Sequence, residues 1–154
     1  MTWKLTSPAF ENGQRIPAEF TCEGTDISPE LNWSTPPEST LELVLIMDDP
    51  DAPMGTWTHW LIYAMSPALT SLPENVEKSS TVASIQAKQG ITSFRRPGYG
   101  GPCPPPGPDH RYFFRLYAVD TATNLPPDAS KAELEKAIQG HVIGKAELMG
   151  TYSR

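Results

Sequence analysis

The chain has 154 residues, of which 17 are proline and 38% are hydrophobic, and its formal net charge is −6. This length is typical of one domain, residues 1–154, and a proline share roughly twice the ordinary 5% disfavours a helical bundle. The negative charge repels phosphate backbones and anionic lipid surfaces, so we expect no nucleic-acid partner. The hydrophobic content suffices for a buried core and argues against a disordered chain.

No apolar run approaches the roughly 20 residues that span a bilayer. The first eight residues lack an apolar stretch that ends in a small-residue cleavage site. We therefore expect a cytoplasmic protein without stable membrane insertion. The two cysteines, Cys22 and Cys103, match no zinc or redox spacing, and in a reducing cytosol we expect thiols rather than a disulfide.

Apolar residues alternate with a period of two between prolines and glycines, which is the pattern of strands and turns. This pattern predicts an all-β, mainly antiparallel domain. The seven expected strands cover residues 3–6, 15–20, 31–33, 41–48, 56–65, 82–87 and 112–120.

One helix is expected near the C-terminal end of the chain. Ser130 and Glu133 fit a capping box, apolar residues follow at helical spacing, and Gly140 stands where a helix stops. These features predict a helix over residues 130–139. The tail 141–154 is ambiguous, because its helical spacing is interrupted by glycines.

The end of the fourth expected strand and the turn after it carry three carboxylates in four positions, Asp48, Asp49 and Asp51. Such crowding raises carboxyl pKa values or requires a cationic partner. A calcium loop would need an oxygen donor and a glycine where Pro53 and Met54 stand, so we expect no metal here. The simpler interpretation is a proline-stiffened turn with solvated carboxylates.

The next expected strand begins with a histidine between two tryptophans. Strand alternation predicts that Trp57, His59, Leu61 and Tyr63 share one face. A lone histidine on such a face is usually a core residue with satisfied hydrogen bonds, so His59 by itself does not indicate a site.

A second histidine and a proline-rich loop change that interpretation. Residues 95–109 contain six prolines and four glycines and lead directly into the strand 112–120, which is typical of a pocket wall rather than a linker. His110 and Tyr112 share a face there. Two imidazoles, a phenol and an aspartate beside glycine N–H groups would suit a small anion. Four residues, Arg95, Arg96, Tyr99 and Arg111, are expected at the rim of this pocket. They either recognise a partner protein or only keep the loop in contact with solvent.

Two separated motifs carry a family resemblance. Asp-Pro-Asp-Ala-Pro at 49–53 and Trp-x-His at 57–59 form the first, and Gly-Pro-x-Pro-Pro at 101–105 with His-Arg-Tyr at 110–112 forms the second. They resemble the two signature regions of the phosphatidylethanolamine-binding protein (PEBP) family, and the likeness is greatest to its short bacterial and archaeal, Raf-kinase-inhibitor-like branch. The resemblance runs almost end to end. The first region is short between Pro53 and Trp57, and the helical extension of mammalian members is missing.

This resemblance implies a fold and a site. The fold is a large central sheet packed with a smaller sheet and one or two peripheral helices, and the turn at 49–53 is expected to contain a cis X-Pro bond. No cofactor, metal or catalytic residue accompanies the family's pocket. Its ligand-binding and wall residues would be Asp49, His59, His110, Tyr112, Pro53, Trp57, Gly101 and Pro102.

Three functions use these residues. The first is binding of a small anion, such as phosphate, acetate or a phosphorylethanolamine head group, with regulation of a protein partner such as a kinase. The second is inhibition of a kinase or protease through the loops. The third is hydrolysis, with Asp49 orienting His59 and with His110 as acid or base, but no nucleophile motif is present and Cys103 is wedged between prolines. We therefore expect a binding protein rather than an enzyme. Formation of a homodimer is an open alternative.

Overall fold

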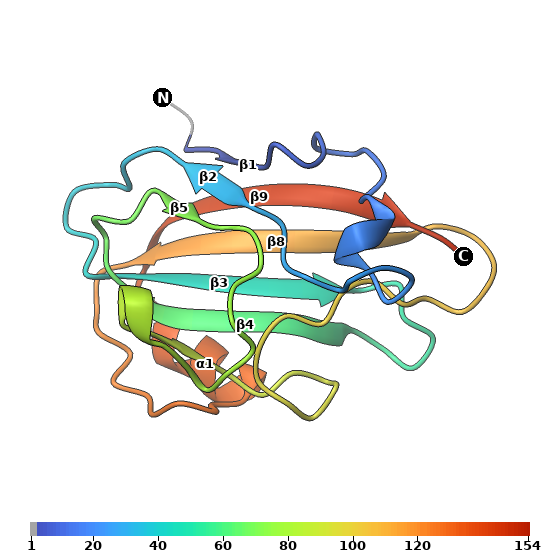
Figure 1. Ribbon diagram of the computed structural model, residues 1–154. Coiled ribbons are helices and arrows are strands. Elements are labelled where there is room, and N and C mark those ends of the chain that lie inside the picture. The colour runs from blue at the N-terminus through green and yellow to red at the C-terminus, as the bar shows by residue number, and fades with distance from the viewer. Residues whose placement is uncertain (1–2) are drawn as a thin grey trace.

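Two antiparallel sheets and one helix stack in three layers in the computed structural model, which describes residues 3–154 (Figure 1). The small sheet has the strand order β1-β2-β5, and the large sheet has the order β6-β7-β4-β3-β8-β9. This arrangement confirms the expected fold class. The strands are β1 (Leu5–Thr6), β2 (Leu31–Trp33), β3 (Glu42–Asp49), β4 (Trp57–Met65), β5 (Ser71–Leu72), β6 (Thr81–Val82), β7 (Ala87–Gln89), β8 (His110–Val119) and β9 (Val142–Tyr152), and the helical segments are η1 (Ala18–Phe20), η2 (Ala83–Ile85) and α1 (Lys131–Ile138).

Strand β3 lies at the centre of the large sheet and is buried along its whole length. Its near-continuous apolar sequence is what a strand with both faces covered requires. Leu45 packs into the core between the two sheets. Ile46, on the opposite face, packs with Leu134 and Ile138 of α1.

Helix α1 begins and ends where the sequence predicts. Ser130 Oγ accepts the Glu133 N–H at 3.1 Å, and Glu133 Oε1 accepts the Ser130 N–H at 2.9 Å. Gly140 follows the helix at φ +80°, a conformation that glycine adopts without strain. No helix within residues 3–154 has both the length and the apolar character needed to cross a bilayer.

Two of the predicted strands are wrong in detail. In the expected strand 15–20, Arg15 forms only an isolated bridge and Ala18–Phe20 form η1, because Pro17 has no N–H to donate to a sheet. Residues 82–87 split into β6, η2 and β7, where Gln86 turns the chain at φ +54°.

The C-terminal tail is the long edge strand β9, which the sequence left ambiguous. It pairs with β8 from Val119↔Val142 to His110↔Tyr152. Glycine is required in this strand where another segment packs closely against it, because a Cβ on Gly150 would lie 2.5 Å from the Ile16 side chain. Gly150, one of the glycines that interrupt the helical spacing in the sequence, thus allows the N-terminal segment to approach β9 closely.

The turn between β3 and β4 contains no cis peptide bond, and none occurs anywhere in residues 3–154, so the expected cis X-Pro bond is wrong. The chain reverses by other means. Asp49 Oδ1 accepts the Asp51 N–H at 2.8 Å, and Gly55 takes φ +107° while its N–H donates to the Ala52 carbonyl.

Cys22 and Cys103 form a disulfide, so the expectation of two thiols is wrong. The bond joins the segment after η1 to the proline-rich loop, with the Cα atoms 5.4 Å apart. Spacing along the chain could not show this pairing, because the fold brings together two loops that lie 81 residues apart in sequence.

Candidate anion-binding pocket

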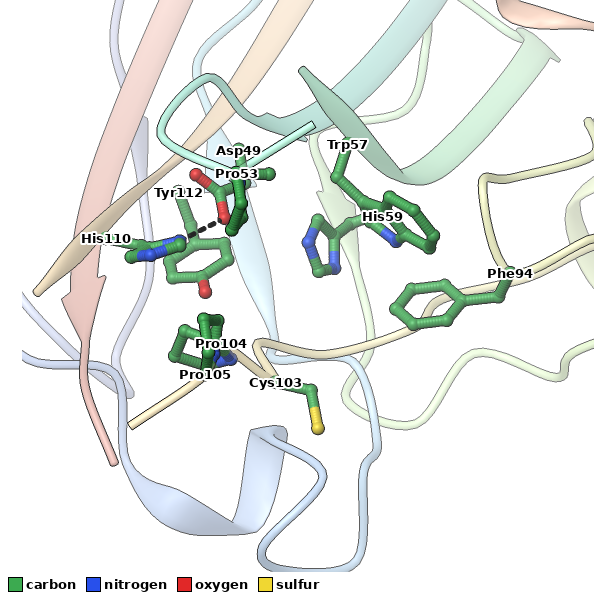
Figure 2. Close-up of a pocket in the computed structure, with 11 residues that line it drawn as sticks. Asp49, Pro53, Trp57, His59, Phe94, Cys103, Pro104, Pro105, His110 and Tyr112 are labelled. Atoms are coloured by element: carbon green, nitrogen blue, oxygen red, sulfur yellow. Dashed lines mark hydrogen bonds and ion pairs between the residues drawn. The ribbon is translucent and has the colours of Figure 1, made fainter. Parts of the chain in front are cut away.

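A small cavity of about 180 Å³ lies at the end of the large sheet, where β3 ends and β4 and β8 begin (Figure 2). Six of the eight expected site residues line it, and Gly101 and Pro102 do not. The lining residues are Asp49, Ala52, Pro53, Trp57, His59, Phe94, Cys103, Pro104, Pro105, His110 and Tyr112.

A β-bulge aims His59 at the cavity. Thr58 pairs with Asp48 and Trp60 pairs with Met47, so His59 is an extra residue in the ladder. Bulges of this kind re-aim side chains beside functional sites.

The bulge also overturns the expected face of β4. Trp60 and Ile62 pack in the core between the sheets, whereas Leu61 and Tyr63 pack on the side of α1. The predicted row of Trp57, His59, Leu61 and Tyr63 is therefore broken after the histidine. The prediction assumed strict period-two alternation along the strand, and the sequence gives no signal for the extra residue that a bulge inserts.

The ring of His59 is fixed by a reciprocal pair of hydrogen bonds with Gly100. His59 Nδ1 lies 2.6 Å from the Gly100 carbonyl oxygen, and the Gly100 N–H donates to the His59 carbonyl at 2.9 Å. Because a carbonyl only accepts, Nδ1 carries the proton. Burial lowers the pKa of His59 below its usual 6.5, against smaller opposing effects of the Gly100 hydrogen bond and the Asp49 charge. The ring is therefore neutral at pH 7.

His110 and Asp49 form a buried pair on the other side of the cavity. His110 Nδ1 lies 2.7 Å from Asp49 Oδ2, and Asp49 Oδ1 already accepts the Asp51 N–H. The two residues are 8% and 3% exposed. The pair leaves Nε2 of His110 as the nitrogen available to a ligand.

A second ion pair fixes the turn that carries the pocket wall. Asp51 accepts three hydrogen bonds at 2.9 Å from the backbone N–H, Nε and Nη2 of Arg111. The Arg111 side chain holds the pKa of Asp51 at about 2. The turn that carries Pro53 is thereby tied to β8 through Arg111.

The third carboxylate faces away from the cavity. Asp48 binds Arg115 at 2.8 Å and Lys131 at 3.1 Å. The crowding seen in the sequence is therefore relieved by separate partners: Asp48 pairs with Arg115 and Lys131, Asp51 pairs with Arg111, and Asp49 hydrogen-bonds His110. Within residues 3–154, no group of three or more His, Cys, Asp or Glu side chains is placed to hold a metal ion.

Tyr112 lies between the two imidazoles and is completely buried. Its ring stacks on His110 at 6.4 Å and meets His59 edge-on at 5.2 Å. Its hydroxyl has no hydrogen-bond partner in the described part of the chain, and it points toward the wall formed by Pro104 and Pro105 (Figure 2). Burial raises the pKa of Tyr112, so the hydroxyl keeps its proton and can donate it to an acceptor in the cavity.

Two glycine amides of the loop, those of Gly100 and Gly101, are not free, contrary to expectation. The Gly100 N–H donates to His59, and the Gly101 N–H donates to Asp26 Oδ1 at 2.7 Å. These donors hold the loop and are not available to an anion. Side chains, not loop amides, supply the polar groups of the cavity.

Gly101 and Pro102 do not line the cavity but contact the segment that packs behind the proline-rich loop. A Cβ on Gly101 would lie 2.1 Å from the Phe20 carbonyl oxygen, so glycine is required for this close approach. The Pro102 carbonyl accepts the Cys22 N–H at 3.1 Å, next to the disulfide to Cys103. These contacts fasten the wall to the segment around η1.

Other expectations about the loop change as well. Tyr99 is buried and donates its hydroxyl to the Phe20 carbonyl at 2.6 Å, so it is no rim residue. Arg111 is occupied by Asp51. Phe94, which packs edge-on against both His59 and Trp57, was missed because it stands in a loop without periodicity.

The sequence comparisons place the chain in one family. The family model described as phosphatidylethanolamine-binding protein matches residues 6–153. A UPF0098 protein of Pyrococcus horikoshii is 49% identical over all of this chain and 78% of its own length. A UPF0098 protein of Aquifex aeolicus is 47% identical over 98% of this chain and 88% of its own. The chain belongs to the phosphatidylethanolamine-binding protein family.

Solved structures agree with this assignment. A PEBP homologue of Chlamydia trachomatis has a TM-score of 0.89 at 40% identity, over 99% of this chain and 98% of that one. YbcL of Escherichia coli, described as a member of the mammalian PEBP family, has a TM-score of 0.91 at 30% identity, over 100% and 99% of the two chains. The resemblance drawn from the two motifs is confirmed.

Proposed function

We propose that this protein binds a small phosphate-type anion, such as phosphate or phosphorylethanolamine, in the cavity between His59, His110 and Tyr112. The observation that carries the proposal is the buried hydroxyl of Tyr112, which has no partner in the described chain. A buried polar group without a hydrogen bond costs about 1–3 kcal/mol, and an anion oxygen would remove that cost. Membership of the family is consistent with such a ligand.

The size of the cavity limits the ligand and its affinity. About 180 Å³ is less than the roughly 300–1,000 Å³ of sites for drug-sized molecules. A ligand of a few heavy atoms makes few contacts, so we expect dissociation constants from about micromolar to millimolar.

Hydrolysis has less support than binding. The Asp49–His110 pair resembles the carboxylate–imidazole unit of a general base. However, Cys103, the candidate nucleophile next to the cavity, is held in the disulfide. The same residues are thus better explained as ligand-binding groups.

The second part of the proposal is that the bound state of the pocket regulates a partner protein, such as a kinase or protease. Met54 is 95% exposed in the turn beside the cavity, and Trp57, which lines the cavity, is 37% exposed. Exposed apolar side chains at a pocket mouth are typical of contact surfaces. Capture experiments with Met54→Ser and wild-type protein test this part, since equal recovery of all proteins would contradict it.

Isothermal titration calorimetry at pH 6 tests the binding proposal. Wild-type protein is titrated with phosphate and with phosphorylethanolamine, and Tyr112→Phe should bind both about tenfold more weakly or worse. Tyr117→Phe is the matched control, because Tyr117 lies on the same strand and packs on the side of α1. Absence of binding by the wild type would overturn the proposal.

A further inference from the structure

We propose that two copies of this chain associate through the open edge of β9, with the two strands antiparallel about a twofold axis at Ala146. The pairing stretch is residues 144–148. It lies in the first half of β9, whereas the cavity lies beside the other end of the ladder, where His110 pairs with Tyr152. The inference is therefore independent of the proposed function.

Strand β9 is the outer strand of the large sheet, and only its second half is covered (Figure 1). The N-terminal segment 12–16 runs along that half. The Met149 N–H donates to Asn12 Oδ1 at 2.8 Å, and the Thr151 N–H donates to the Gln14 carbonyl at 2.9 Å. The edge is therefore closed from residue 149 onward.

The first half of the same edge is open. Successive residues of an antiparallel strand direct their backbone N–H and C=O groups to opposite edges. Met149 points outward, and the ladder with β8 is regular back to residue 144, so Lys145 and Glu147 point outward as well. Within residues 3–154, no loop or side chain hydrogen-bonds their backbone groups, and β1 pairs with β2 instead. Unpaired groups of this kind are a template for a further strand.

The side chains of this edge are self-complementary in charge. A lone lysine at a sheet edge discourages strand addition, but here exposed Glu147 stands on the same face as exposed Lys145. When the Ala146 residues of two copies face each other, Lys145 lies opposite Glu147 of the second copy, and the reverse pair forms across the axis. Opposite charges that face each other on neighbouring strands stabilise the pairing. Each of these residue pairs also exchanges both N–H···O=C bonds, because outward-pointing groups meet.

Neighbouring registers are disfavoured by the same groups. A shift of one strand by two residues sets Lys145 opposite Lys145 of the second copy, and the reverse shift sets Glu147 opposite Glu147. Like charges directly opposite each other are destabilising. A shift by one residue sets outward-pointing groups against residues that are bonded to β8. Only the axis at Ala146 satisfies both the charges and the backbone.

Two exposed apolar residues stand at the start of this strand. Val142 and Ile143 are 42% and 39% exposed, and Ile143 is an extra residue in the ladder with β8, where the strand bends. In the pair, this bend carries both side chains against segment 12–16 of the second copy. The paired stretch is short, so the interface falls in the class below about 1,200 Å², with a dissociation constant of about micromolar or weaker.

Sedimentation velocity over a wide range of protein concentration and at low ionic strength tests the inference. The wild type should move from monomer towards dimer as its concentration rises. Lys145→Glu should weaken this association about tenfold or more, because it sets two carboxylates opposite each other on both sides of the axis. Lys136→Glu on α1 is the matched control, because it changes the net charge equally at an exposed position away from β9. A monomeric wild type at every concentration would overturn the inference, and so would association that Lys145→Glu leaves unchanged.

A mixture of two variants tests the register. Glu147→Lys alone should also fail to associate, while Arg115 keeps its bond to Asp48. Mixed with Lys145→Glu, it forms a pair in which each glutamate faces a lysine, so the mixture should associate within about threefold of the wild type. A mixture that stays monomeric would contradict the axis at Ala146.

Amide hydrogen exchange of the wild type does not depend on any variant folding. In dilute protein, the Lys145 and Glu147 amides should exchange fast, while those of Ala146 and Leu148 are protected by their bonds to β8. In concentrated protein, Lys145 and Glu147 should slow about tenfold or more. Equal exchange of these two amides at both concentrations would overturn the inference.

Discussion

His110 donates its Nδ1–H to the Asp49 carboxylate across 2.7 Å, although the two residues are 61 positions apart in the sequence. Asp49 ends β3 and His110 begins β8, and these strands are neighbours in the large sheet. The sheet register therefore holds the pair, and the Asp49–Asp51 and Asp51–Arg111 bonds fix the turn around it. A histidine oriented in this way keeps Nε2 directed at a ligand.

Tyr112→Phe should weaken phosphate binding and leave the stability of the protein unchanged. The substitution removes an oxygen that has no partner among the described residues, so the free energy of unfolding should stay within about 1 kcal/mol of the wild-type value. Urea denaturation without ligand measures this. A loss of more than about 2 kcal/mol would show that the hydroxyl is bonded in the free protein.

Asp49→Asn should weaken phosphate binding at pH 7.5. The asparagine side chain can present its NH2 group as well as its oxygen to His110, so it no longer fixes Nδ1 as the donor and Nε2 as the nitrogen directed at the anion. Calorimetry checks this. Affinity equal to wild type at pH 7.5 would mean that Asp49 does not control the ligand. His110→Ala is a poorer test, since it leaves the Asp49 carboxylate buried without its partner.

The disulfide should stabilise both the fold and the pocket wall. Cys22→Ser with Cys103→Ser should lower the free energy of unfolding by about 2–4 kcal/mol, because the bond closes a long loop. Both cysteines are exposed, so a small dithiol should reduce the wild type to the same stability. Urea midpoints with and without the dithiol measure the effect, and the double variant should not respond to it. Identical midpoints for oxidised and reduced wild type would contradict this role.

Burial of His59 should make the stability of the protein depend on pH. Its pKa is lower in the folded state than the 6.5 of the unfolded chain, so the unfolded state binds more protons below that value. The contribution is fully present above about pH 6.5 and is lost as the pH falls through the folded pKa, by at most about 1.4 kcal/mol per pH unit. Urea denaturation between pH 7.5 and 5 should show this decline, and His59→Gln should reduce its slope. An unchanged slope in the variant would assign the decline to other groups.

The sequence predicts local features of this protein better than features created by tertiary contacts. The capping box at Ser130 and Glu133 lies within one turn of helix, so its signal is complete in the sequence. The tail that forms β9 was ambiguous because glycines interrupt its helical spacing, and one of them, Gly150, is required by the close approach of the Ile16 side chain from the other end of the chain. The spacing of residues within the tail cannot predict a contact with a segment so far away in the sequence.

The candidate site shows the same division. The family motifs span ten of the eleven residues that line the cavity, and only Phe94 lies outside them. The bulge at His59 and the disulfide to Cys103 depend on how neighbouring segments pack, and both escaped prediction. The glycine amides were expected to face the ligand, but the loop uses them to bind His59 and Asp26.

The central claim is that a phosphate-type anion occupies the space between His59, His110 and Tyr112. The chain has three histidines, and NMR of their imidazoles during a phosphate titration at pH 6.5 tests the claim directly. We predict that the signals of His59 and His110 shift together and saturably, that those of exposed His141 do not move, and that Tyr112→Phe needs about tenfold more phosphate for the same shift. Signals of His59 and His110 that do not respond to phosphate, or that move no more than those of His141, would contradict the claim.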